Sequence, residues 1–473
     1  MKVLFVSSEV YPFAKTGGLG DVAYALPKAL CKEGVDCRVI MPKYSDIPED
    51  YSGKMQYICN FNVSVGWRQQ YCGLFLLQYE GVKYYFVDNE YYFKRNGLYG
   101  YYDDGERFAF FCRAVMESIF RMDDFRPDVI HCNDWQTGLI PVMFRDRYDK
   151  SPDLEHTKTV YTIHNLKYQG VFDPKLLEEI CGLSYRYYAE DKLKYKDGMS
   201  FMKGGIVFAD KVTTVSKTYS EEIKDAYFGE GLEGLMREKA YKLCGITNGI
   251  DYEQYNPLKD PYIACNFSDR SIGRKKTCKT DLQEEFGLPK NPDVPVIGLV
   301  TRLVRQKGID LITCVMEEII KMDLQFVVLG SGDRDYQDFF EYYASAYPGK
   351  VACYIGYSEK LANKIYAGSD MFIMPSQFEP CGISQMISMR YGSVPIVRET
   401  GGLKDTVIPY NEFDGTGNGF SFKNYNAHEM LNTIRYAAEQ YGKKDSWNKL
   451  VKNAMKTKND WSSSAKKYIE LYK

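Results

Sequence analysis

Residues 15–21, with the sequence KTGGLGD, have the composition of an anion-binding loop. They follow residues 2–7 (KVLFVS), a short apolar run that predicts a buried parallel strand. After them, apolar residues recur at helical spacing up to Leu30, and Gly34 is suited to end that helix. Paired glycines at a helix start leave backbone N–H groups open to a phosphate, and Lys15 adds a positive charge. An ordinary glycine turn before a helix is the alternative interpretation.

The same stretch also fits the dinucleotide-binding pattern G-x-G-x-x-A over residues 18–23. In that fold the first glycine follows the strand almost directly, whereas residues 8–16 intervene here. The acidic residue for the ribose should stand at the end of the second strand, near Met41, but Asp36 stands at its beginning. The spacing therefore disfavours a dinucleotide-dependent enzyme.

A basic loop in the second half of the chain could bind a diphosphate. Residues 301–308 (TRLVRQKG) come directly after an apolar strand. Arg302 can bind two oxygens at once through its planar guanidinium, and Lys307 adds a point charge. A solvated basic loop without a ligand is the alternative.

A third loop, residues 375–384 (PSQFEPCGIS), combines a carboxylate with a glycine turn. Pro380 is suited to the first position of a helix, which would place Glu379 just before that helix. Glu379 could hold sugar hydroxyls while the N–H group of Gly382 faces a phosphate. It could instead be a simple helix cap.

Strand ends in the first half deliver further polar residues. A strand ending at His131 precedes Asp134, and the strand at 159–163 precedes His164. His164 stands where parallel strands present ligand-binding residues, so we expect it in a site. His131 also stands at a strand end, but a buried core histidine is the usual interpretation, and we favour it here.

Composition limits the function classes. The 473 residues are 45% hydrophobic and 26% charged with a net charge of −2, which gives no reason to expect a nucleic acid or an anionic membrane as partner. The 13 cysteines include no C-x-x-C pair, so free thiols in the cytoplasm are the expectation. The chain opens directly on a strand and no apolar run approaches the ~20 residues of a membrane span, so neither a targeting segment nor a membrane span is expected.

Alternating strands and helices predict two α/β domains, each with a doubly wound, Rossmann-like parallel sheet, facing a central cleft. We expect a first domain over 1–250, a second over 251–455, and a terminal helix within 456–473 that crosses back onto the first. Residues 55–87 predict a hairpin beside the main sheet. In the second domain, strands are predicted at 296–300, 325–329, 351–355, 371–375 and 394–397.

Taken together, these stretches resemble the bacterial glycogen synthases and plant starch synthases over essentially the whole chain. The resemblance implies a GT-B fold and a retaining glucosyltransferase that uses ADP-glucose to extend the non-reducing end of an α-1,4-glucan. The order of the motifs carries it: KTGGLGD at 15–21, DW at 134–135, TIHN at 162–165, TNGID at 247–251, R302…K307-G308, FEPCG at 378–382 and TGGL at 400–403.

The resemblance also implies roles for individual residues. Glu379 would bind the transferred glucose, with Asp134, His164 and Asn248 around the sugar. Arg302 and Lys307 would hold the diphosphate. The remaining donor-site residues that it implies are Lys15, Gly17, Gly18, Asp21, Tyr357, Cys381, Gly382 and Ser384.

Two residues depart from the pattern. The broader retaining class often has a second glutamate where this chain has Ile387, and many family members have a histidine where it has Gln136. No second carboxylate accompanies Glu379, which favours front-face substitution without a covalent intermediate.

The sequence gives no reason to expect a metal or a cofactor. Asp333 and Asp335 form a D-x-D pair, which binds metal in another glycosyltransferase fold, but their place after a glycine turn favours a helix cap. A UDP-glucose enzyme of the same fold is the nearest alternative function. A dinucleotide-dependent nucleotide-sugar enzyme and a non-catalytic glucan-binding protein are more distant ones.

Overall fold

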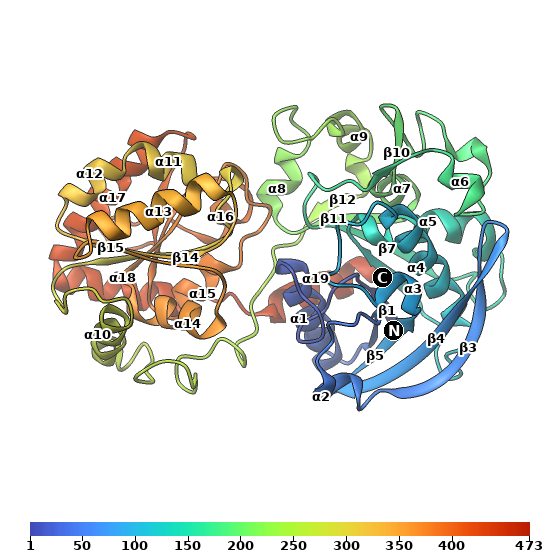
Figure 1. Cartoon of the computed structure of the whole chain (residues 1–473), viewed down its shortest axis with the longest axis horizontal. Helices are drawn as coiled ribbons and strands as arrows, with labels where there is room; N and C mark the ends of the chain where they lie inside the picture. The colour runs from blue at the N-terminus through green and yellow to red at the C-terminus, as the bar shows by residue number, and fades with distance from the viewer. The chain divides into compact units, whose positions relative to one another are not determined.

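The computed structural model describes residues 1–473 and contains two compact units. The first unit comprises Met1–Asn248 together with Trp461–Lys473, and the second comprises Gly249–Asp460 (Figure 1). All 13 cysteines are free thiols. No helix combines the length and the apolar character required to cross a bilayer.

The first unit is built on a nine-stranded sheet with β1 near its centre. The strands from β12 to β5 run parallel, and β4 and β3 continue the sheet antiparallel. The predicted hairpin is therefore not beside the main sheet but part of it, because β5 pairs in parallel with β2. In sheet order the strands are β12 (Leu243–Gly245), β11 (Lys211–Thr214), β7 (Lys158–Ile163), β6 (Val129–Asn133), β1 (Lys2–Val6), β2 (Asp36–Pro42), β5 (Val82–Asp88), β4 (Arg68–Tyr79) and β3 (Gln56–Val65).

Helices cover both faces of this sheet. Helix α1 (Gly18–Lys32) connects β1 to β2 and packs against the C-terminal helix α19 (Trp461–Tyr472). The connections from β5 to β6 and onward run in the opposite direction across the sheet, so right-handed crossovers put their helices on the other face. Those are α4 (Asp104–Ile119), α5 (Leu139–Met143) and α7 (Phe201–Phe208).

His131 anchors the C-terminal helix to the sheet. Its side chain is fully buried on β6, with Nδ1 2.7 Å from the Tyr472 hydroxyl and Nε2 2.6 Å from Thr162 Oγ1. The core position that the sequence favours for His131 is confirmed. The short elements of this unit are α2 (Glu49–Ser52), α3 (Glu90–Phe93), α6 (Leu176–Glu179), α8 (Lys217–Glu222), α9 (Glu233–Glu238) and the small sheet of β8 (Val171–Phe172), β10 (Gly198–Ser200) and β9 (Lys194–Tyr195).

The second unit is a six-stranded parallel sheet, and its predicted strands are confirmed. Helices α11 to α13 lie over one face, and α14 and α15 lie over the other (Figure 1). The strand order is β15 (Val351–Ile355), β14 (Gln325–Gly330), β13 (Val296–Val300), β16 (Met371–Met374), β17 (Val394–Arg398) and β18 (Phe420–Phe422). The helices are α10 (Lys275–Glu285), α11 (Ile309–Cys314), α12 (Met316–Lys321), α13 (Arg334–Ala346), α14 (Glu359–Gly368), α15 (Ser384–Arg390), α16 (Gly401–Thr406), α17 (Ala427–Gly442) and α18 (Lys444–Lys456).

In both units the direction of winding reverses beside the first strand. In the first unit the reversal falls between β1 and β6, and in the second between β13 and β16. At such a switch point the loops after the two strands diverge to opposite faces, which opens a crevice at the carboxyl ends. The predicted loops at 15–21, 301–308 and 375–384 all follow these strands.

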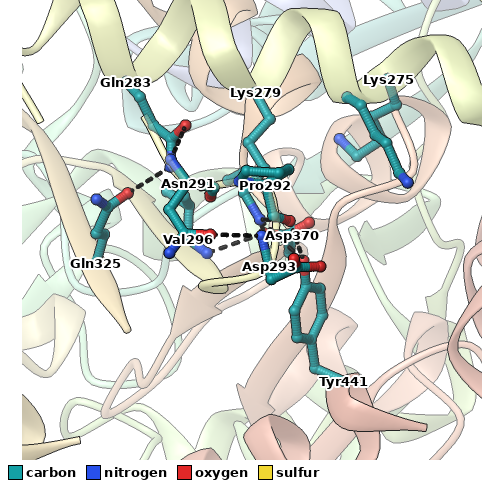
Figure 2. A network of polar contacts seen from close by, with 12 residues as sticks. Lys275, Lys279, Gln283, Asn291, Pro292, Asp293, Val296, Gln325, Asp370 and Tyr441 are labelled. Atoms are coloured by element: carbon teal, nitrogen blue, oxygen red, sulfur yellow. Dashed lines mark hydrogen bonds and ion pairs between the residues drawn. The ribbon is translucent and has the colours of Figure 1, made fainter. Parts of the chain in front are cut away.

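The amino end of the second sheet is held by a buried ion pair (Figure 2). Lys279 Nζ lies 2.7 Å from Asp370 Oδ2, and their side chains are only 3% and 12% exposed. Asp370 Oδ2 also accepts a hydrogen bond from the N–H of Val296, at the start of β13. Lys279 donates to the carbonyl of Pro292 and to the Tyr441 hydroxyl. The pair therefore joins α10, the start of β13 and the residue before β16.

We expect Asp370→Asn to destabilise the second unit by about 3–5 kcal/mol, because it leaves the Lys279 charge buried without its counter-ion. Urea unfolding followed by circular dichroism would measure the change. Asp293→Asn is the matched control, since Asp293 is 82% exposed and 3.7 Å from Lys444, and such pairs contribute about 0–1 kcal/mol. Equal midpoints for the two variants would contradict the role given to Asp370.

Candidate active site

The candidate site of the first unit includes the loop between β1 and α1. The carboxylate of Glu9, only 4% exposed, accepts hydrogen bonds from the N–H groups of Thr16 and Gly17 and from Thr16 Oγ1, the last two at 3.3 and 3.1 Å. Of the glycine N–H groups that the sequence predicts to be open to a phosphate, that of Gly17 is thus already occupied by the protein. A side-chain carbon added at Gly17 would meet no atom within 4 Å, so the space in front of the loop is open.

The charge of Lys15 is balanced within the same loop. Lys15 Nζ lies 2.6 Å from Asp21 Oδ1, and the two side chains are 29% and 16% exposed. Burial raises the pKa of Asp21, and the neighbouring Lys15 charge opposes that rise. Lys15, Gly17, Gly18 and Asp21 therefore lie together at the start of α1, whose N-cap residue, Gly17, has no side chain to cap the helix.

Asp134 and His164 meet at the carboxyl ends of β6 and β7. Asp134 has a φ of 55°, a conformation that costs energy in a non-glycine residue, and its Oδ1 accepts a hydrogen bond of 2.8 Å from the His164 N–H. His164 Nε2 lies 2.9 Å from Asn133 Oδ1, while the Asn133 amide donates to the Val6 carbonyl. This arrangement makes Nε2 the protonated nitrogen and leaves Nδ1 with a lone pair.

Burial sets the charge of both groups. It lowers the pKa of His164 to about 3, so the imidazole is neutral at neutral pH. Burial raises the pKa of Asp134 to about 7, against the N–H groups of His164 and Asn165, which hydrogen-bond its carboxylate. His164 is thus suited to hydrogen bonding with a neutral ligand rather than to acid catalysis or to binding an anion.

Two further residues at strand ends carry unpaired buried oxygens. Asn248 and Gln136 are each 6% exposed, and Asn248 Oδ1 and Gln136 Oε1 have no hydrogen-bond partner. A buried acceptor without a partner is costly, so such atoms are suited to a ligand or water. The Gln136 side-chain oxygen is thus an acceptor that a ligand or water could use.

The candidate site of the second unit lies at its own switch point. Lys307 Nζ lies 2.7 Å from Glu379 Oε2, which also accepts a 2.9 Å hydrogen bond from Ser376 Oγ. The Lys307 and Glu379 side chains are 17% and 8% exposed, whereas Arg302 is exposed. The loops at 301–308 and 375–384, separate in sequence, therefore form one charged cluster.

Three glycines allow the loops of this cluster to approach each other. Gly308 has a φ of 74°, and a side-chain carbon there would lie 2.1 Å from the Pro375 carbonyl oxygen. Gly401 has a φ of 44°, and a carbon there would lie 2.0 Å from the Glu379 carbonyl oxygen. A side-chain carbon added at Gly402 would likewise clash with the Cys381 carbonyl oxygen. No other residue fits these positions without moving the backbone around Glu379.

Glu379 is not a helix cap. The helix after it, α15, begins at Ser384 with Ile383 as its N-cap, not at Pro380 as the sequence predicts. The residues from Pro380 to Ile383 instead form a turn, in which Gly382 has a φ of 74° and Cys381 is buried. The turn is kept by contacts of Gln385, whose amide donates to the carbonyls of Cys381 and Gly382.

Two residues discussed from the sequence, Tyr357 and Asp333, lie on other loops of the second unit. Tyr357 follows β15 and is 71% exposed. Asp333 is the N-cap residue of α13, although its side chain makes no capping hydrogen bond.

The sequence gives no signal for Glu9 of the first unit, because a single glutamate shortly before a proline carries no motif of its own.

We expect Gly401→Ala to lower kcat about 100-fold, because the added carbon displaces the backbone of Glu379 and small displacements in a site cost about that much. Gly442→Ala, where the added carbon meets no atom within 4 Å, is the control and should keep wild-type activity. Steady-state kinetics of the two folded variants measure the difference in kcat. Wild-type kcat for Gly401→Ala would mean that this close approach does not position Glu379.

Comparison with known proteins matches both units. The family described as starch synthase catalytic domain covers residues 2–238, and the family of group 1 glycosyl transferases covers 281–457. Glycogen synthases of Clostridium acetobutylicum and Caldicellulosiruptor saccharolyticus are 57% and 56% identical, each over 100% of this chain and 99% of the relative.

Solved structures agree with these matches. The catalytic domain of starch synthase IV from Arabidopsis thaliana, bound to ADP and acarbose, superposes with a TM-score of 0.92 at 34% identity, covering 99% of this chain and 98% of that one. Sucrose-phosphate synthase from Thermosynechococcus elongatus shares the fold, with a TM-score of 0.64 at 15% identity over 100% and 98%. The predicted fold class and family are confirmed, and the chain belongs to the glycogen and starch synthase family of GT-B glycosyltransferases.

Proposed function

We propose that this protein transfers glucose from ADP-glucose to the non-reducing end of an α-1,4-glucan, with retention of configuration. The observation that carries the proposal is the pairing of Lys307 with Glu379 at the switch point of the second unit, with Arg302 on the same loop as Lys307. It combines two cations suited to a diphosphate with one carboxylate suited to sugar hydroxyls. The starch synthase bound to ADP and acarbose supports the same donor and acceptor classes, as do the glycogen synthases that match this chain over its full length.

The proposed roles follow the chemistry of each group. Arg302 and Lys307 bind the diphosphate, and Glu379 binds hydroxyls of the transferred glucose. Tyr357 stacks on the adenine. The further residues that we propose as donor contacts are Lys15, Gly17, Gly18, Asp21, Asp134, His164 and Asn248 of the first unit, and Cys381, Gly382 and Ser384 of the second.

The reaction breaks the bond between the glucose anomeric carbon and the diphosphate, and forms one between that carbon and the acceptor 4-oxygen on the same face. The acceptor proton passes to the leaving diphosphate. Arg302 and Lys307 stabilise the charge that the leaving oxygen of the diphosphate gains, while neutral His164 accepts a hydrogen bond from a sugar hydroxyl through Nδ1 without adding charge. No protein nucleophile is needed, which accords with Ile387 at the second-glutamate position.

Incorporation of labelled glucose into glycogen tests the proposal. We expect ADP-glucose to be used in preference to UDP-glucose, the product to be fully digestible by an α-1,4-specific hydrolase, and activity to persist in excess EDTA, since cations of the protein balance the diphosphate. Preference for UDP-glucose would favour the alternative donor. An absolute requirement for Mg²⁺ or Mn²⁺ would contradict the assigned roles of Arg302 and Lys307.

Glu379→Ala should lower kcat by about 10²–10³, the usual effect of losing one transition-state contact, while ADP binding stays nearly unchanged. Its loss frees Lys307 from an ion pair, so affinity for the diphosphate should not fall. Glu412→Ala is the matched control, because Glu412 also pairs with a lysine, Lys443, but is 40% exposed. Calorimetric ADP titration and kinetics separate the two effects; an equal loss of ADP affinity and activity would show that Glu379 acts on the nucleotide.

A further inference from the structure

Glu9 is a buried carboxylate whose bonding partners all lie in an exposed loop. Its side chain reaches from the end of β1 to Thr16 and Gly17, which are themselves exposed. Burial raises the pKa of Glu9, and the hydrogen bonds from the Thr16 and Gly17 N–H groups oppose that rise. A carboxylate is costly to bury unless donors compensate it, so the contact is specific to the conformation that aims these N–H groups inward.

The backbone of Glu9 is held in turn by its neighbours. Ser7 Oγ donates to the Glu9 carbonyl at 2.7 Å, and the Ser7 N–H donates to the Ile40 carbonyl on β2. Ser8 Oγ lies 2.8 Å from the hydroxyl of Tyr99. Glu9 is thus fixed to the core sheet, whereas the loop it binds contains adjacent glycines with no side chain to restrict them.

Such a loop would lose considerable conformational entropy on adopting one shape. Neither Gly17 nor Gly18 can pack a side chain against the core, and Gly17, the N-cap residue of α1, has no side chain with which to cap the helix. Three hydrogen bonds to Glu9 hold the backbone of this loop at Thr16 and Gly17, in addition to the ion pair of Lys15 with Asp21.

We propose that Glu9 is a positioning residue for the donor-binding loop: it holds Thr16 and Gly17 so that Lys15 and the start of α1 face the donor diphosphate. The role rests on the proposed function. In this role, Glu9 takes the hydrogen bonds of the Thr16 and Gly17 N–H groups, which are then not available to the donor. Gly17 then serves the site by having no side chain, and N–H groups from Gly18 onward are the ones that remain for an anion.

The test combines hydrogen exchange with kinetics on the full-length chain. Glu9→Gln keeps the size of the side chain but replaces one acceptor oxygen with a donor. Mass spectrometry of peptides covering 13–20 should show faster amide exchange than in the wild type, with unchanged exchange elsewhere in the first unit. With ADP-glucose and glycogen, kcat should fall about 10-fold to 100-fold, while the KM for glycogen changes little.

Glu9→Asp keeps the charge one methylene shorter and should be intermediate in both measurements. Glu49→Gln, an exposed glutamate of α2, is the matched control and should match the wild type in both. Wild-type exchange at 13–20 in Glu9→Gln would overturn the proposal. So would a lower kcat with unchanged exchange, since Glu9 would then act on the substrate directly.

If Glu9→Gln does not fold, Glu9→Asp decides by the same two measurements, and wild-type values for both would overturn the proposal. The exchange measurement needs no substrate. A wild-type protein that fails to use ADP-glucose would therefore refute the proposed function, while the exchange data would still report whether Glu9 orders the loop.

Discussion

The reversal of winding beside the first strand of each sheet is the constraint on which the candidate site depends. Because parallel strands need right-handed crossovers, a chain that moves first one way and then the other across a sheet places its helices on opposite faces. The loops after the two strands at the reversal then separate, and their side chains and N–H groups remain uncovered. Both units have this arrangement, at β1 and β6 in the first and at β13 and β16 in the second.

The charges at these loops are balanced within the protein. Lys15 pairs with Asp21 in the first unit, and Lys307 pairs with Glu379 in the second. Each lysine thus has a carboxylate within 2.7 Å. A diphosphate would compete with these carboxylates for the lysines, and in the second unit this competition would leave Glu379 oxygens available to sugar hydroxyls. Binding of the diphosphate to Lys307 and release of the Glu379 carboxylate from its ion pair would then be one event.

Burial, rather than residue type, determines the chemistry of the polar groups at β6 and β7. A histidine with its ordinary pKa would be partly charged near neutrality, but His164 is neutral because the imidazolium would be desolvated. Asp134, by contrast, titrates near neutrality because few donors compensate its burial. These two residues contact each other, so the neutral hydrogen-bonding character of His164 depends on the same strand ends that hold Asp134.

What the sequence by itself determined is local: the alternating apolar strands, the glycine loops with their cations, and the motif order that identifies the family. Strand pairing was beyond it, because period-2 patterns show that strands exist but not which neighbour each one takes, as β5 beside β2 demonstrates. Only the tertiary structure decided three contacts: the ion pair of Lys307 with Glu379, the close approach of a glycine to the Glu379 backbone, and the hydrogen bonding of Thr16 to Glu9. Each joins residues brought together by packing, and no local pattern encodes the distance between them.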